Sequence, residues 1–272
     1  MIAYRVRTQD LVAGDIMVVV GIVGSPQKNG RTNSLIDAVL EGAESRGVET
    51  KKVYLIDYDV KSYKGSEGSS EGFTYCPEEL SRLCNGSDAL VLGAPIYWGD
   101  INGLMKDFMD TVNIPITSGK PALGVAVAGG SGRGMVSGVQ SLYNFFFHKQ
   151  MMAIDPTPVS RFNMQESLEE LKMSGTRLAD LSQKKETFPG NTVDERLPVV
   201  QAYYTSLKYL DCDPLDECIM LDRQLTKISE GEKVEEAKVE DKALVLVSEG
   251  FRSAAAEHAV KAYLLLYFPA KE

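Results

Sequence analysis

The chain has 272 residues, of which 44% are hydrophobic and 25% are charged, a composition typical of globular proteins. Its net charge of −9 and its pI near 5.0 argue against nucleic acid and anionic membrane surfaces as partners, because both attract positively charged proteins. The longest apolar run, 16–24, is under half of the roughly 20 residues that span a bilayer, so no membrane association is expected.

The N-terminal residues 1–15 are interpreted as an extension that forms a short edge strand or an interface arm, since apolar residues alternate from Ile2 to Val6. They do not resemble a secretion signal, because Asp10 and Asp15 lie where positive charge is expected. With four scattered cysteines, no C-x-x-C pair and two histidines, a disulfide framework or a zinc site is not expected. We therefore expect a cytoplasmic protein without a metal site.

The first strand, predicted at 16–24, is an unbroken apolar run that suits a strand covered on both faces of a parallel sheet. A polar loop rich in glycine follows at 25–33, and a helix is predicted at 33–46, ended by Gly47. This order points backbone N–H groups at whatever lies above the strand, which suits a phosphate. The spacing fits neither Walker A nor the Gly-x-Gly-x-x-Gly pattern. The alternative is a plain turn with a helix cap.

Strands and helices then alternate along the chain. Strands are predicted at 50–56, 89–94, 121–128 and 151–155, and helices at 77–83, 101–112 and 134–152. Between the second strand and the next helix, the segment 57–75 is rich in Gly, Ser, Lys and Glu. It is interpreted as a mobile loop that covers the active site or reaches a neighbouring subunit. The alternative is a solvated insertion. Five strands alternating with helices predict a doubly wound parallel α/β sheet.

The C-terminal part of the chain is predicted to be mainly helical, at 165–185, 195–211, 214–229 and 251–268. The acidic stretch 230–241 is interpreted as a linker, and 243–247 is either a strand or a helix, because a short apolar run does not distinguish them. We place the sheet domain at 1–158 and a helical extension at 159–272, whose expected role is packing or contacts in a homodimer or homotetramer.

Three motifs occur in order: Gly24-Ser25-Pro26-Gln27-Lys28-Asn29-Gly30-Arg31-Thr32, the segment from Asp88 through Ala94-Pro95-Ile96-Tyr97-Trp98-Gly99 to Asp110, and Lys120 to Gly132. Together they resemble the NADPH-dependent FMN reductase family over about Met17 to Pro156, and most of all its iron–sulfur flavoprotein branch. The resemblance implies a flavodoxin-like fold with a five-stranded sheet, bound FMN, and NADH or NADPH as co-substrate.

The chain departs from the family pattern in two places. Gln27 replaces the usual Arg or Lys of the first loop, which leaves phosphate neutralisation to Arg31, Lys28 or the backbone. The iron–sulfur branch carries four cysteines after its second strand, whereas the equivalent segment 57–77 holds only Cys76. Because a cubane cluster needs four thiolates, no iron–sulfur cluster is expected.

Loops 25–33, 95–101 and 129–134 would meet at the carboxyl rim of the sheet, where open α/β sheets bind ligands. The first would hold phosphate, the second would run along the ring system, and the third would approach its pyrimidine edge. The residues expected to bind the cofactor are Ser25, Gln27, Asn29, Gly30, Arg31, Thr32 and Asn33, then Pro95, Ile96, Tyr97, Trp98 and Gly99, and finally Gly129, Gly130, Ser131 and Gly132.

Two side chains near the predicted site each have two possible interpretations. Trp98, the only tryptophan, either lines the flavin or is a core or interface residue, and Arg133 either serves the cofactor site or is a surface arginine. No side chain is expected to be catalytic, because hydride transfer between nicotinamide and flavin needs placement rather than a nucleophile.

The predicted function is an FMN-dependent NAD(P)H oxidoreductase that passes electrons to a small-molecule acceptor: a quinone, a free flavin, a nitro compound or a metal complex. The alternative is a flavodoxin-like electron-transfer protein that exchanges electrons with a redox partner. A third possibility is a flavodoxin-fold binding protein that has lost FMN, as Gln27 would suggest.

Overall fold

A computed structural model describes residues 17–65, 74–229, 237 and 242–268 of the chain. The predicted N-terminal edge strand lies outside these residues, as do the middle of the 57–75 loop and, apart from Ala237, the predicted acidic linker. Within the described residues no helix is both long enough and apolar enough to cross a bilayer.

The centre of the sheet consists of three parallel strands, β1 (Val18–Val23), β3 (Ala89–Tyr97) and β5 (Pro121–Ala128). Their apolar residues are buried because helices cover both faces of the sheet, as the unbroken hydrophobic runs predicted. The edge strand β2 (Glu49–Tyr54) pairs with β1 and is more exposed. The order β2-β1-β3-β5-β6 is that of a flavodoxin-like fold, which confirms the predicted fold class.

The prediction of five strands needs correction, because seven strands pair into the sheet within the described part of the chain. The predicted fifth strand is two short segments, β6 (Met152–Ala153) and β7 (Val159–Ser160), which pair with the start and the end of β5. Pro156 and Pro158 lie between them, and proline cannot donate a ladder hydrogen bond. The other extra strand, β4 (Asp100–Ile101), pairs antiparallel with the end of β3.

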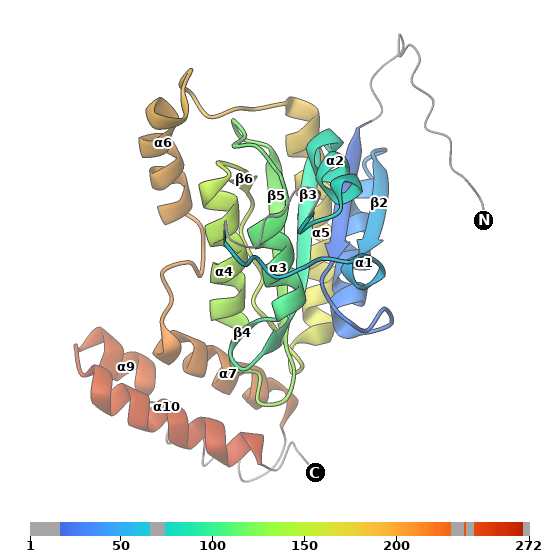
Figure 1. Ribbon diagram of the computed structural model, residues 1–272. Helices are drawn as coiled ribbons and strands as arrows, with labels where there is room; N and C mark the ends of the chain where they lie inside the picture. The colour runs from blue at the N-terminus through green and yellow to red at the C-terminus, as the bar shows by residue number, and fades with distance from the viewer. Residues whose placement is uncertain (1–16, 66–73, 230–236, 238–241, 269–272) are drawn as a thin grey trace, which may run out of the picture.

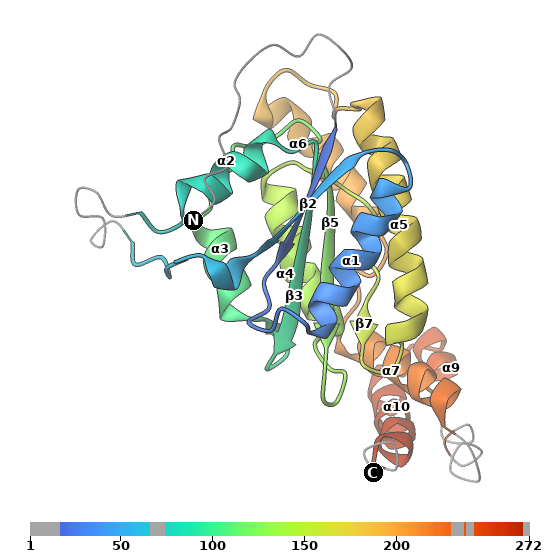
Figure 2. The same cartoon turned by 90° about the vertical axis from the view of Figure 1, so that its right-hand side faces the viewer.

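Two layers of helices enclose the sheet (Figure 2). One face carries α1 (Arg31–Glu44) and α5 (Met164–Lys184), and the other carries α2 (Glu78–Gly86), α3 (Gly103–Thr111), α4 (Met135–His148) and α6 (Val193–Thr205). The α1–α5 crossing is close: a Cβ added at Gly175 would lie 1.9 Å from the Val39 carbonyl oxygen. Thus α5 and α6, which follow residue 158, join the two hydrophobic clusters of the sheet, while the domain boundary at 158 stays a prediction.

The last part of the chain forms a third hydrophobic cluster below the carboxyl end of the sheet (Figure 1). It contains α7 (Pro214–Ile228), α9 (Ala243–Ser248) and α10 (Arg252–Tyr267), so the segment left open between strand and helix is helical. Asp213 and Asp216 form a capping box at the start of α7. The cluster includes Met135 and Val136, and therefore holds these helices against the first turn of α4.

Candidate cofactor site

The first loop connects β1 to α1 and leaves the start of that helix open. Ser25 and Thr32 are buried, and the Ser25 Oγ accepts a hydrogen bond from the Gln27 amide at 3.1 Å. Helix α1 begins after Gly30, which is its N-cap and supplies no side-chain cap. Since the first N–H groups of a helix have no partner within it, this end is suited to an anion.

Two cations lie near this loop, and the structure distinguishes them. Lys28 forms an ion pair with Asp57, with 2.6 Å between Nζ and Oδ1. Arg31, at the exposed first position of α1, has no ion pair within the described residues. Of these two cations, Arg31 is thus the one without an ion pair among the described residues, and the neighbouring Gln27 and Asn29 are exposed neutral side chains.

Asn33, predicted to contact the phosphate, uses its side-chain amide for hydrogen bonds to β2 and within α1. Its Oδ1 accepts from Lys52 and Tyr54 at 2.9 and 2.8 Å, and its Nδ2 donates to Asp37 at 2.8 Å. Burial lowers the pKa of Lys52, but hydrogen bonds and charges, led by Asp37, outweigh that effect and raise it above its ordinary value. The Asn33 side chain thus fastens α1 to β2.

The second predicted loop is a β-hairpin. Pro95, Ile96 and Tyr97 belong to β3, and only Trp98 and Gly99 form the turn, with φ values of 56° and 91°. Two positive φ values suit a tight hairpin, although a tryptophan in this conformation is strained. Trp98 is fully exposed, so it is not a core residue, and the alternatives of a flavin contact or an interface residue stay predictions. A Cβ added at Gly134 would meet Ile96, so this side chain packs toward the start of α4.

The third loop, Gly129–Gly134, folds back on itself through a 2.7 Å hydrogen bond from the Gly132 amide to the Gly129 carbonyl. Gly130, Gly132 and Gly134 all have positive φ, which explains the run of glycines. The C-terminal helices hold the loop from outside. Tyr263 donates to the Ser131 carbonyl at 3.0 Å, and the Glu217 Oε1 accepts from the Gly134 amide at 2.8 Å.

The structure brings the three loops together at one rim. Asn102 donates from Nδ2 to the Gly24 carbonyl at 2.8 Å, which joins the segment after the hairpin to the first loop. Ser137 at the start of α4 donates to the Gly99 carbonyl, which joins the hairpin to the third loop. A Cβ added at Gly129 would lie 3.9 Å from the Arg31 Nη1, which brings the third loop close to the first.

This rim has the features that FMN needs. The α1 start and Arg31 suit its phosphate, and a Cβ added at Gly99 or Gly130 would meet no atom within 4 Å, so the space beside these turns is open. The Oδ1 of Asn102, just beneath the rim, is buried without a hydrogen-bond partner among the described residues. The chain's donors and its open glycine surface therefore fit an anionic ligand with a flat ring.

The sequence did not reveal all of these residues. Glu217 and Tyr263 lie more than 80 residues after the loop that they contact, and no local pattern connects them to it. Asn102 carried a signal, because Asn immediately before a helix is a common N-cap, and it is the N-cap of α3. Arg133 lies over the Tyr263 ring, 5.2 Å from its centroid, and so packs toward the C-terminal helices.

The cysteines do not gather at the rim. Cys76, Cys84 and Cys218 are buried, and burial raises the pKa of the Cys84 thiol to about 12. Within the described part of the chain, no three metal-binding side chains of the His, Cys, Asp or Glu type lie together. The absence of an iron–sulfur cluster stays a prediction.

Comparisons with known proteins fit this geometry. A family model described as NADPH-dependent FMN reductase matches residues 17–163. An iron–sulfur flavoprotein of Methanocaldococcus jannaschii is 30% identical over 154 residues, which cover 52% of this chain and 79% of that protein. An FMN-dependent NADPH-azoreductase of Staphylococcus aureus is 28% identical over 118 residues, 43% of this chain and 61% of that protein.

Solved structures show the same fold. RosB, solved with bound 8-demethyl-8-formylriboflavin-5′-phosphate, is similar with a TM-score of 0.51 and 14% identity over 72% of this chain and 89% of that one. An oxidoreductase of Corynebacterium diphtheriae has a TM-score of 0.50 at 18% identity, over 63% of this chain and 99% of its own.

Proposed function

Because the chain belongs to the NADPH-dependent FMN reductase family, we propose that it binds FMN at the carboxyl rim of its sheet and uses NADPH or NADH to reduce it. The observation that carries the proposal is the convergence of three loops beside a helix start that has no side-chain cap and an arginine without an ion pair among the described residues. When bound, FMN supplies the chemistry of hydride acceptance and electron donation.

The residues of the first loop would bind and orient the FMN phosphate. Ser25, Thr32 and the first N–H groups of α1 would hold the phosphate, and Arg31 would offset its charge. Gln27, Asn29 and Gly30 would shape this loop. Asn33 would act indirectly, by fixing α1 to β2.

The other two loops would bind the ring. Tyr97 and Trp98, at the hairpin, would present aromatic surface to it, an arrangement worth about 0.5–1.5 kcal/mol beyond the area buried. Gly129, Gly130 and Gly132 carry no Cβ, so the backbone of the third loop would lie close to the pyrimidine edge, with Ser131 between them. No side chain is assigned a catalytic step.

We propose a small-molecule acceptor such as a quinone, a free flavin, a nitro compound or a metal complex. The rim is open beside Trp98, which suits molecules that arrive and leave after each electron transfer. The alternative, a protein redox partner, predicts that bound FMN stays oxidised when NAD(P)H is added.

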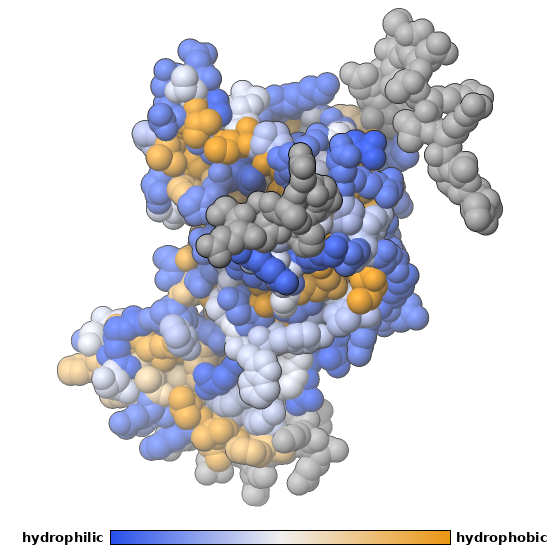
Figure 3. Space-filling model, viewed as in Figure 1, coloured by the Kyte–Doolittle hydropathy of each residue, from blue (hydrophilic) through white to orange (hydrophobic). Residues whose placement is uncertain are grey.

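We also propose that the protein forms a homodimer or homotetramer through its C-terminal helices. Leu244, Val245, Phe251, Leu264 and Phe268 on α9, α10 and their flanks are exposed. Figure 3 shows apolar surface gathered over this region and over α6. Light scattering coupled to size exclusion would give the mass, and a monomer at micromolar concentration would contradict this part of the proposal.

The experiment that tests the function is a titration of the purified protein with FMN, followed by NADPH or NADH without oxygen. We expect bound FMN with absorption bands near 370 and 450 nm, bleaching by at least one nicotinamide cofactor, and reoxidation by a quinone or a nitro compound. A protein that takes up no FMN would overturn the proposal. One that binds FMN without NAD(P)H oxidation would favour the electron carrier.

A further inference from the structure

A buried glutamate of the C-terminal helices occupies the start of α4, directly after the third loop. The Oε1 of Glu217 accepts from the amides of Gly134 and Val136 at 2.8 and 3.1 Å, and the residue is 8% exposed. These two amides belong to the helix end that would otherwise present partial positive charge at the rim. A carboxylate more than 80 residues away in sequence therefore caps α4.

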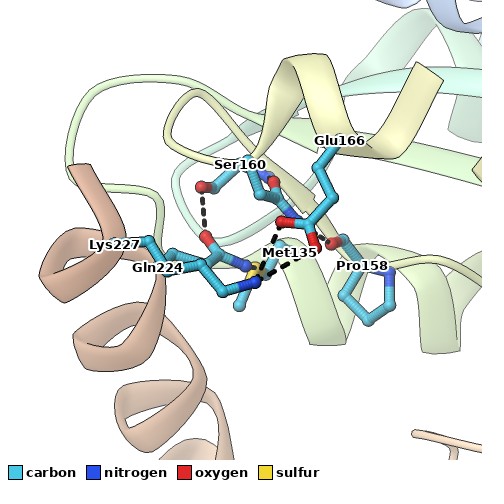
Figure 4. A network of polar contacts seen from close by, with 7 residues as sticks. Met135, Pro158, Ser160, Glu166, Gln224 and Lys227 are labelled. Carbon is cyan, nitrogen blue, oxygen red and sulfur yellow. Dashed lines mark hydrogen bonds and ion pairs between the residues drawn. The ribbon is translucent and has the colours of Figure 1, made fainter. Parts of the chain in front are cut away.

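Helix α7, which carries Glu217, is fixed to the same rim by further contacts. Gln224 accepts from the Ser160 hydroxyl at the end of β7 at 2.5 Å and donates to the Met135 sulfur at 3.6 Å. Figure 4 shows these residues side by side. Lys227 forms an ion pair with Glu166 at 3.0 Å. Leu221 closes the third loop from below, because a Cβ added at Gly132 would lie 2.6 Å from it.

We propose that Glu217 is the positioning residue of the third loop and that its charge lowers the reduction potential of the FMN bound beside this loop. The inference rests on the proposed function, because it needs flavin at this rim. Two-electron reduction places negative charge on the pyrimidine side of a flavin. A carboxylate at the α4 start offsets the positive helix end there, so the reduced form is stabilised less than it would be by an open helix end.

Arg133 carries the opposite charge on the same loop and allows a second, independent test of the proposal. Arg133 is exposed and lies over Tyr263, and its Nη2 is 3.8 Å from the Cys218 sulfur, so it borders the same loop without capping the helix. Its positive charge would stabilise reduced flavin, and its removal would shift the potential in the opposite direction from removal of the Glu217 charge.

The test compares the midpoint potentials of FMN-loaded Glu217→Gln, Arg133→Gln and wild-type protein by equilibration with redox dyes. Glu217→Gln keeps an oxygen acceptor for both amides and removes the charge. We expect its ratio of reduced to oxidised flavin at a fixed potential to rise about tenfold, a shift of about +30 mV for a two-electron couple. Arg133→Gln should shift this ratio downward.

A matched control is Glu195→Gln. Glu195 accepts from the Asn191 amide at 2.8 Å at the start of α6, far from the third loop, and is exposed. Its substitution removes the same charge at another helix start and should leave the potential unchanged. If Glu217 had only a structural role, Glu217→Gln would change the thermal unfolding temperature. The midpoint potentials of Glu217→Gln and Arg133→Gln would then not shift in opposite directions.

The outcomes separate the two proposals. Wild-type protein that binds no FMN overturns the proposed function and this inference with it. Protein that binds FMN and is reduced by NADPH, but whose potential is the same in Glu217→Gln, overturns only the inference. If Glu217→Gln does not fold, Arg133→Gln decides alone: an unchanged or raised potential contradicts the proposed effect of charge at this loop.

Discussion

Two helices begin at the same rim, and their N-terminal ends differ in how their amides are satisfied. Helix α1 starts after Gly30 without a side-chain cap, next to Arg31, whereas the start of α4 is occupied by the carboxylate of Glu217. An open helix end attracts an anion, and a capped one is satisfied within the protein. The comparison supports the proposal that the phosphate lies at α1, whereas α4 would face a part of the cofactor that carries no charge in its oxidised form.

The largest expected effect comes from a variant in which a carboxylate caps the start of α1, as Glu217 caps the start of α4. Gly30→Asp places a carboxylate at an N-cap whose φ of −89° any residue adopts, with its Cβ 3.2 Å from the Gln27 carbonyl oxygen, a close contact that Gly30→Ser shares. We expect FMN affinity to fall at least about 100-fold, because the carboxylate repels the phosphate. The free energy of unfolding should change by only about 0.3 kcal/mol, because glycine is itself a good N-cap. Fluorescence titration with FMN and thermal unfolding measure the two effects.

The control for this change is Gly30→Ser, which caps the helix without charge. Its FMN affinity should stay within about tenfold of wild type, because a hydroxyl leaves the helix end neutral. FMN binding by Gly30→Asp at wild-type strength would contradict the assignment of the phosphate to this helix end.

The second change tests how the C-terminal helices shape the third loop. Gly132 has a φ of 80°, and an added Cβ would lie 2.6 Å from Leu221 and 3.0 Å from Phe162. Gly132→Ala should lower the free energy of unfolding by about 2–3 kcal/mol. Gly130→Ala has the same backbone problem but an unobstructed Cβ, and should cost about 1 kcal/mol. Equal losses in urea unfolding would show that α7 does not confine the loop.

The third change addresses the charge at the open helix end. Arg31→Gln should weaken FMN binding about tenfold, because Arg31 is the cation expected to face the phosphate. Lys28→Gln is the matched variant and should change the affinity less than threefold, since Lys28 is already paired with Asp57. The reverse order of effects in titrations at equal salt would assign the phosphate to Lys28.

The smallest expected effect concerns the hydroxyl that joins α10 to the third loop. Tyr263→Phe removes the hydrogen bond to the Ser131 carbonyl and keeps the ring that lies under Arg133. It should lower the free energy of unfolding by about 0.5–1.5 kcal/mol and FMN affinity by about twofold. Urea unfolding and FMN titration measure both, and an unchanged stability would show that α10 only covers the loop.

Much of the architecture could be predicted because its signals are local. The apolar runs at 18–23 and 89–94 define strands covered on both faces, and the polar loop that follows the first run predicts a helix after it. That helix is predicted from 33, and α1 begins two residues earlier, at Arg31. The fold class and the family were therefore within reach of the sequence alone. The number of strands was not, because the pairing of 159–160 with β5 and of 100–101 with β3 depends on neighbours in space.

The sequence by itself determined the alternation of strands and helices around the central strands, the run of glycines in the third loop, and which loops follow the strands of the sheet, since all of these depend on residues close together in the chain. Only the tertiary structure decided that Lys28 is paired while Arg31 is not, that Asn33 binds β2, and that Glu217 caps α4. These contacts join residues up to 83 positions apart. No local pattern encodes them, because they exist only where packing of the hydrophobic clusters brings the elements together.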